Sequence, residues 1–170
     1  MKTRKLYYED GPIQYKGEIN KGLPHGRGTA YMRNGNIAYE GQFEQGKPHG
    51  QGRAYLENGN LYYAGDFKDG IPDGQGNNYY PDGNIQYKGA WKDGLQNGQG
   101  ILLYNDGAVL FQGDFKDGKQ NGQGTIYLKN GNMSYEGTFK DGVPHGQGTG
   151  YLEDGAIVYQ GEWKDGRPNE

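Results

Sequence analysis

The chain has 170 residues, of which only 32% are hydrophobic, and it carries a net charge of −3 and no cysteine. The absence of cysteine excludes disulfides and thiolate metal sites. The mixed, slightly acidic charge argues against a nucleic-acid-binding protein, which needs a basic stripe. Low apolar content is typical of disorder, but 16 tyrosines, 5 phenylalanines and 2 tryptophans are too many aromatic residues for a disordered chain. We therefore expect a thin folded structure whose burial comes mainly from aromatic side chains.

The first ten residues are basic but lack an apolar segment, so no secretory signal peptide is predicted. No run of residues approaches the ~18 apolar positions that a membrane-spanning helix needs. These two features predict a cytoplasmic protein.

A 24-residue unit repeats along the whole chain. All but one of the 34 glycines, the exception being Gly150, fall in five fixed slots of this unit. Repeats of about 20–50 residues indicate arrays in which each copy packs on its neighbours. Residues 1–170 are therefore predicted to form a single array, with a half-unit at 1–14, six full units over 15–158 and a partial unit at 159–170. An aromatic residue opens each copy without a slip in spacing: Tyr15, Tyr39, Tyr63, Tyr87, Phe111, Tyr135 and Tyr159.

Each unit has the pattern of two strands. In the copy that opens at Tyr39, residues 37–44 alternate between apolar and polar side chains, as a half-buried strand does. Residues 45–50 contain glycine and proline and are predicted to be a loop, after which 51–56 form a second strand and 57–59 turn the chain back. The predicted fold is all-β: an elongated single-layer antiparallel β-meander with one hairpin per 24-residue unit and about 14 strands.

The turn that follows Leu56 can be typed from the sequence. A two-residue Asn-Gly turn would pair Leu56 with Leu61, whereas a three-residue loop with glycine in a left-handed bulge position would pair Tyr55 with Leu61. Proline at the corresponding place in the next copy, Pro81, suits the first corner of a type I turn and would forfeit a ladder hydrogen bond in the two-residue alternative. We therefore predict the three-residue loop, which would place Tyr55 on the same face as the other repeated aromatics.

That face is predicted to carry a ladder of apolar side chains. In one copy Ile37, Tyr39, Phe43 and Tyr55 share it, and Gly41 lies between the two rings of the first strand. A glycine there leaves room for a ring to lie flat over the backbone. Edge-on ring contacts would add ~0.5–1.5 kcal/mol each beyond area burial. Because no hairpin could stand alone, stability should be a sum of nearest-neighbour terms.

The glycine and aromatic slots resemble the MORN repeat family. Its Tyr-x-Gly-x-aromatic-x-x-Gly-x-x-His-Gly-x-Gly core occurs at 39–52 and again at 135–148. The period of 24 and the Asn-Gly turn are similar to a bacterial variant of the repeat that includes proteins described as antitoxins. The resemblance implies a twisted antiparallel sheet with an aromatic-lined groove. It also implies attachment to membranes or to other proteins, the role proposed for these repeats beside lipid kinase and SET methyltransferase domains and in junctophilins.

No catalytic, metal or cofactor site is expected. The three histidines are His25, His49 and His145, and copies of this slot in adjacent units would lie about 10 Å apart, too far to share a metal. Asn or Asp takes the slot in the other copies, which predicts a turn residue. The Gly-x-Gly pairs lack the following helix that a phosphate site uses. No nucleophile and base recur together, so the chain is predicted not to be an enzyme.

Two sets of side chains are predicted to meet a partner along the sheet. An apolar patch outside the ladder is expected from Leu102, Tyr104, Leu110 and Ile126, with extra packing inside a twisted sheet as the alternative. The other set is the aromatic lining of the groove: Tyr39, Phe43, Tyr63, Phe67, Tyr87, Trp91, Phe111, Phe115, Tyr135 and Phe139.

The C-terminal strand is a third predicted contact surface. It carries Val158, Tyr159 and Trp163, and the seventh copy stops before a second strand could cover it. An uncovered strand is a template for pairing. We expect this edge to meet a partner or a second copy of the chain in a homodimer.

These features predict a non-enzymatic binding or scaffold protein whose partner is another protein. One form of this function is an antitoxin or immunity protein that occludes a toxic effector. The alternative is a membrane-associated adaptor that binds phospholipid head groups. The repeated turn pairs such as Lys68-Asp69 disfavour the adaptor, because each lysine carries its own neutralising charge. No nucleic-acid partner is expected.

Overall fold

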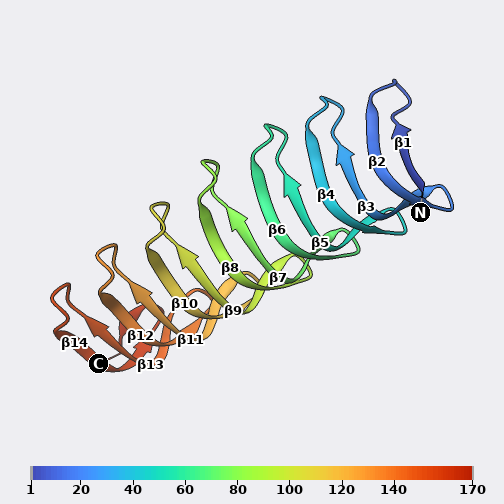
Figure 1. Cartoon of the computed structure of the whole chain (residues 1–170). Coiled ribbons are helices and arrows are strands. Elements are labelled where there is room, and N and C mark those ends of the chain that lie inside the picture. The colour runs from blue at the N-terminus through green and yellow to red at the C-terminus, as the bar shows by residue number, and fades with distance from the viewer. Residues whose placement is uncertain (1, 170) are drawn as a thin grey trace. The chain divides into compact units, whose positions relative to one another are not determined.

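The computed structural model describes residues 2–169, and all of their regular structure is antiparallel strand. The chain divides into two compact units, Met1–Gly83 and Asn84–Glu170. Each is a single-layer meander in which consecutive strands pair side by side (Figure 1). The boundary falls in a turn, and the 24-residue period of the sequence runs through it. The prediction of an all-β meander is confirmed, with no helix in residues 2–169.

The described residues form fifteen strands, one more than predicted. The first unit contains β1 (Lys2–Tyr7), β2 (Ile13–Asn20), β3 (Leu23–Tyr31), β4 (Ile37–Glu44), β5 (Lys47–Tyr55), β6 (Leu61–Lys68) and β7 (Ile71–Tyr79). The second contains β8 (Ile85–Lys92), β9 (Leu95–Leu103), β10 (Val109–Lys116), β11 (Lys119–Tyr127), β12 (Met133–Lys140), β13 (Val143–Tyr151), β14 (Ile157–Lys164) and β15 (Arg167–Pro168).

The first turn of each repeat is shorter than predicted. Between β4 and β5 only Gln45 and Gly46 lie outside the strands, and both have positive φ, 49° and 87°, as a type I′ hairpin turn requires. The prediction of a loop over 45–50 is therefore wrong. Pro48 lies inside β5, where the pairing with β4 shifts register, and such an irregularity tolerates a proline in a strand.

The second turn is the predicted three-residue loop. The Leu56 N–H donates to the Asn60 carbonyl at 2.8 Å, and the Gly59 N–H donates to the Leu56 carbonyl at 2.8 Å. Gly59 has φ 86°, the left-handed conformation that a glycine adopts without strain. Tyr55 pairs with Leu61, which confirms the predicted register at this turn.

Tyr55 nevertheless lies on the opposite face from the one predicted. The pairing of β5 with β6 shifts between Ala54 and Tyr55, and this bulge reverses which second-strand residue faces the buried rings. Ala54, not Tyr55, is directly opposite Tyr39. The Tyr55 hydroxyl instead donates to a carboxylate oxygen of Glu40 at 2.6 Å, on the polar face.

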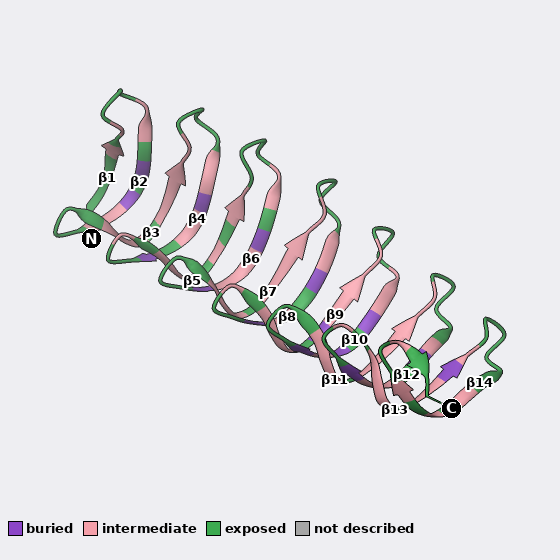
Figure 2. Ribbon diagram, turned by 180° about the vertical axis from the view of Figure 1, so that it is seen from behind, coloured by how far each residue is buried: buried purple, intermediate pink, exposed green. Residues whose placement is uncertain are grey.

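The core consists of aromatic rings in edge-to-face contact. In the first unit Phe43 packs against Tyr15 and Tyr39, and Phe67 packs against Tyr39 and Tyr63, each pair with centroids 5.0 Å apart. The second unit repeats this pattern from Tyr87 to Trp163. Figure 2 shows the buried positions along the first strand of successive repeats. Each ring joins its own repeat to the next, so the stabilisation passes between neighbours.

Each opening tyrosine lies over a pair of facing glycines. Gly41 of β4 and Gly52 of β5 are directly paired, and a Cβ added at Gly52 would overlap the Tyr39 ring. The ring reaches along its own strand, and its hydroxyl donates to the Gln42 carbonyl at 2.9 Å. Burial raises the pKa of Tyr39 to about 12. The predicted role of Gly41, to leave space for a flat ring, fits this geometry, and the ring is that of its own strand.

Where asparagine takes the slot after the turn glycine, its side chain links one second turn to the next. The Asn60 amide donates to the Pro81 carbonyl at 2.7 Å, and in the second unit the Asn132 amide donates to the Glu153 carbonyl at 2.8 Å. Alanine takes this slot at Ala108 and has no side-chain donor for the corresponding turn.

Candidate functional site

The predicted groove aromatics form the buried core. The ten side chains named from the sequence, from Tyr39 to Phe139, are between 0% and 8% exposed. The structure therefore brings them together, as predicted, but little of their surface is open to a partner. Their part in binding stays a prediction, and their contacts in the structure are with one another.

The predicted outer patch is not one exposed surface. Leu102 and Ile126 are the residues paired with Phe111 on either side, which places them on the face of the buried rings. Leu110 is the residue that the pairing of β9 with β10 skips. The Tyr104 hydroxyl donates to the Tyr127 carbonyl at 3.1 Å. All four predicted patch residues are half-buried. A simple alternation misplaces these four residues because it ignores the register shifts at the bulges. Their apolar side chains are explained by packing within the sheet.

The C-terminal edge is partly covered. After β14 the chain turns into β15, whose Pro168 and Arg167 pair with Trp163 and Lys164. The Trp163 side chain is half-buried, and its indole N–H donates to the Gly148 carbonyl at 3.1 Å. The expectation of a wholly uncovered strand is therefore wrong. Within residues 2–169 the part of β14 at 157–161 has no strand beyond it.

At that open part of β14, Val158 and Tyr159 differ in exposure. Val158 is 60% exposed. Tyr159 is half-buried, and its ring packs against Trp163 with centroids 5.6 Å apart. Of the three predicted edge residues, only Val158 presents a mainly exposed side chain.

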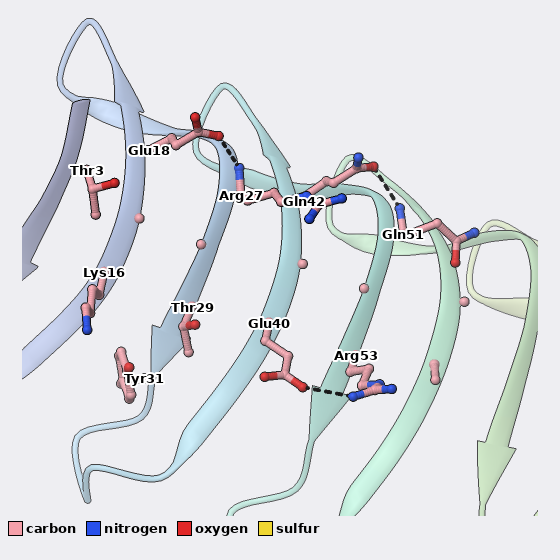
Figure 3. A pocket seen from close by; sticks show the side chains of 16 residues that line it. Thr3, Lys16, Glu18, Arg27, Thr29, Tyr31, Glu40, Gln42, Gln51 and Arg53 are labelled. Atoms are coloured by element: carbon pink, nitrogen blue, oxygen red, sulfur yellow. Dashed lines mark hydrogen bonds and ion pairs between the residues drawn. The ribbon is translucent and has the colours of Figure 1, made fainter. Parts of the chain in front are cut away.

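A groove of about 1180 Å³ lies on the polar face of the first unit (Figure 3). Its floor follows a row of directly paired residues, one from each successive strand. The row is read from the strand register: Lys16 on β2, Thr29 on β3, Glu40 on β4, Arg53 on β5 and Ala64 on β6. Lys5 on β1 continues the row beyond the residues that line the groove. Lys16, Glu40 and Ala64 alternate with the buried rings along β2, β4 and β6. Thr29 and Arg53 are their paired neighbours on β3 and β5.

A second row of polar side chains lies beside the first and stabilises the backbone where strand pairing is irregular. At the register shift within each of the first three full repeats, a polar side chain bends back to accept a backbone N–H. The Glu18 carboxylate accepts the Arg27 N–H at 2.7 Å, and the Gln42 amide oxygen accepts the Gln51 N–H at 3.1 Å. An Asp66 carboxylate oxygen accepts the Gln75 N–H at 2.7 Å. The acidic groups of this row are therefore already used within the fold.

The cations of the groove have few acidic partners. Lys5 and Lys16 are directly opposite each other on adjacent strands, and two like charges in this arrangement destabilise a sheet. Within residues 2–169, neither these lysines nor the Arg27 side chain forms an ion pair. Arg53 reaches Glu40 at 3.4 Å and remains 62% exposed. Among the charged side chains that line the groove, the cations Lys16, Arg27 and Arg53 outnumber the acids Glu18 and Glu40 by one.

Tyrosines border the groove on the side of the second turns. Tyr31 lines it, and Tyr55 follows in the same slot one repeat later. Burial, together with the hydrogen bond to Glu40, raises the pKa of the Tyr55 hydroxyl. Half-buried tyrosines that combine an apolar ring with a polar tip are common at protein interfaces.

The histidines lie near the first turns. His49 Nε2 is 3.4 Å from Glu44 Oε2, and His145 Nδ1 is 3.5 Å from Asp165 Oδ1. His25 and His49 border a shallow hollow beside Phe43. In the described part of the chain no three His, Cys, Asp or Glu side chains gather as metal ligands would.

The repeat geometry agrees with one known family. The MORN repeat model matches seven segments: residues 15–37, 39–61, 63–85, 87–109, 111–133, 135–156 and 159–169. The chain belongs to the MORN repeat family. No curated protein matches it. None of the described residues forms a helix long and apolar enough to cross a membrane.

For this MORN repeat chain, the aromatic-lined groove that the resemblance implied stays a prediction, and Phe43, Phe115 and Phe139 border smaller hollows. The polar groove of the first unit is lined by polar and charged side chains, and the aromatic rings point to the other face. Sequence reasoning missed Lys16, Glu40 and Arg53 as candidate site residues. The signal was present, because they occupy the slots that alternate with the aromatics, but their neighbours across the sheet depend on bulges that the sequence does not mark.

Proposed function

We propose that this MORN repeat chain is a non-enzymatic binding protein that holds a segment of a partner protein along the polar face of its first unit. The observation that carries the proposal is the open groove over β2–β6, whose floor is a row of polar and charged side chains with no element packed on it in residues 2–169.

The size and chemistry of the groove suit a polypeptide better than a small molecule. Pockets for small ligands are enclosed and measure roughly 300–1,000 Å³, whereas this groove is larger and runs across several strands. Thr29, Gln51 and Tyr31 offer donors and acceptors, which an extended backbone could use. A polypeptide supplies both backbone groups and alternating side chains to such a surface.

An antitoxin or immunity protein is one specific form of this proposal, in which the bound segment belongs to a toxic effector in the cytoplasm. The partner's identity decides between that role and a general scaffold. A membrane-associated adaptor is the competing class, and the same variants separate the two.

Site-specific photocrosslinking tests the proposal. A photoreactive benzoylphenylalanine replaces Gln51, which lines the groove, or Gln147, which has the same slot of the repeat in the second unit; both are exposed. In the native host, the Gln51 variant should crosslink to a defined protein and the Gln147 variant should not. The crosslinked protein is then purified and must bind the unmodified chain.

Two results would contradict the proposed function. One is equal crosslinking from both positions, which would indicate chance encounter. The other is sedimentation with vesicles of anionic phospholipid at physiological salt that is lost when groove residues are changed, because it would assign the face to a membrane.

A further inference from the structure

We infer that the first-unit groove selects an extended acidic segment, with carboxylates at positions i and i+4 of the bound chain. This inference rests on the proposed function and specifies the partner chemistry. It follows from the positions of four cations, Lys5, Lys16, Arg27 and Arg53, on the polar face.

Two cations of the paired row, Lys16 and Arg53, define two sites separated along the groove. Lys5, Lys16 and Arg27 lie on β1, β2 and β3 and have no acidic partner in residues 2–169. Arg53 lies on β5, three strands beyond Lys16. It is 3.4 Å from Glu40 and remains 62% exposed, so a ligand carboxylate can share it. Because neighbouring strands are about 4.8 Å apart, the two sites are separated by about 14 Å.

That separation matches an extended peptide. Residues in an extended chain advance about 3.3–3.4 Å each, so positions i and i+4 are about 13–14 Å apart and project from the same side. In a helix the same two positions would be only about 6 Å apart, which would leave one positive site empty. A ligand that lies along the row therefore meets both sites only in an extended conformation.

The acid between the two sites sharpens the selection. Glu40 lies on the row two strands from Lys16 and one from Arg53. Its carboxylate accepts hydrogen bonds from the Tyr55 hydroxyl and from Arg53, which hold it in place on the polar face. A carboxylate at position i+2 or i+3 of the ligand would approach this like charge, so a neutral or basic residue is expected there.

Other polyanions fit the groove less well. A nucleic acid carries a continuous row of phosphates, which would meet Glu40 as well as the cations. The first unit has no net excess of positive charge, with ten Lys and Arg against ten Asp and Glu in residues 1–83, so a membrane surface has little to attract it. Isolated carboxylates on a polypeptide match the alternation of charge.

Two synthetic peptides of identical composition test the inference. Each is a labelled peptide of about nine residues of Ser and Thr with two glutamates, long enough to span the row. In one peptide the glutamates are at i and i+4. In the other they are at i and i+3, on opposite sides of an extended chain. Binding to the full 170-residue chain is measured by fluorescence anisotropy at low salt.

The i, i+4 peptide should bind about fivefold to tenfold more tightly than its isomer, and raising NaCl from about 50 to about 300 mM should weaken it strongly. Lys16→Glu should lower the affinity about tenfold, and Arg53→Glu should act in the same direction. Lys88→Glu is the matched control, because Lys88 is exposed and fills the Lys16 slot in the second unit. It should change the affinity less than about twofold.

A charge swap completes the test. A peptide with lysines at i and i+4 should bind the Lys16→Glu/Arg53→Glu variant better than the unmodified chain. Circular dichroism confirms that each variant is folded, and Lys16→Glu alone serves if the Arg53 variant is not. Equal binding of the two glutamate peptides, or equal loss with Lys88→Glu, would overturn the inference.

The outcomes also separate this inference from the proposed function. If the purified crosslinked protein binds through Gln51 but is insensitive to Lys16→Glu, the inference fails and the protein-binding function stands. If neither glutamate peptide binds while anionic vesicles bind in a Lys16-dependent manner, both fail.

Discussion

Alanine at Gly148 should remove a tyrosine ring from the core of the second unit. A Cβ at this position would overlap the hydroxyl end of the Tyr135 ring, and the Tyr135 side chain is 3% exposed. The ring must leave its place, and with it the edge-to-face contacts to Phe139 and Trp163, at 5.1 and 4.9 Å between centroids. Its hydrogen bond to the Thr138 carbonyl at 3.0 Å is lost as well.

The magnitude follows from those contacts. Two aromatic pairs at about 0.5–1.5 kcal/mol each and one hydrogen bond at about 0.5–1.5 kcal/mol give a loss of roughly 1.5–4.5 kcal/mol. Gly150→Ala is the matched control on the same strand. A Cβ there would be 3.0 Å from the edge of the Trp163 ring, and alanine is the better strand residue, so its effect should stay within about 1 kcal/mol.

Urea denaturation gives the free energy of each variant, and hydrogen exchange with mass spectrometry locates the change. For Gly148→Ala, protection should fall first in β12, β13 and β14, because each repeat is stabilised by its neighbours. Equal destabilisation by the two alanines, or a uniform loss of protection along the chain, would refute the reasoning about the ring.

Three further predictions follow from single contacts. Phe111→Tyr should raise the free energy of unfolding by about 0.5–1.5 kcal/mol in urea denaturation. The reason is that the other opening tyrosines donate to the carbonyl three residues on, as Tyr87 does to Ala90 at 2.9 Å. A lower free energy of unfolding would mean that the site has no room for the hydroxyl. Ala108→Asn should add a turn-to-turn hydrogen bond like that of Asn132 and raise the thermal midpoint, and an unchanged midpoint would count against this role of the asparagines. Burial raises the pKa of Tyr39 to about 12, above the unfolded value near 10, so its contribution to stability is complete below pH ~10 and is lost as pH rises towards 12. Spectrophotometric titration should show a class of tyrosines that ionises near pH 12 only in the folded chain. A single class near pH 10 would contradict this prediction.

The C-terminal edge yields a separate prediction about association. Because the open part of β14 keeps an exposed Val158, we propose that it pairs with a second copy of the chain or with a partner strand. Gly161→Pro, which blocks strand addition, should reduce any concentration-dependent dimer seen by analytical ultracentrifugation. This surface would be excluded as a contact site by two results together. The unmodified chain would be strictly monomeric, and the partner would still bind the proline variant.

The sequence was sufficient to predict the features that recur from one repeat to the next. The period, the buried role of Tyr39 and Phe43, and the three-residue turn at Gly59 all follow from spacing and turn chemistry, and the structure confirms the strands and the turn. Glycine and aromatic slots are informative because few other residues satisfy a left-handed turn or a flat ring over backbone.

The sequence was insufficient where strand pairing shifts by one residue. Tyr55 was placed with the rings, and Leu102 and Ile126 away from them, because a simple alternation ignores the bulges between each pair of strands. The same bulges decide that Lys16 and Arg53 share a cross-strand row. Candidate binding residues therefore became visible only once the register was known.

The affinity of the isolated partner for matched groove variants tests the central claim most directly. Gln51→Trp would fill the first-unit groove, and Gln147→Trp places the same ring in the same repeat slot of the second unit. Isothermal titration calorimetry should show at least about a tenfold loss of affinity for Gln51→Trp and less than about a twofold change for Gln147→Trp. Full affinity of the Gln51→Trp variant would show that the partner binds elsewhere on the chain.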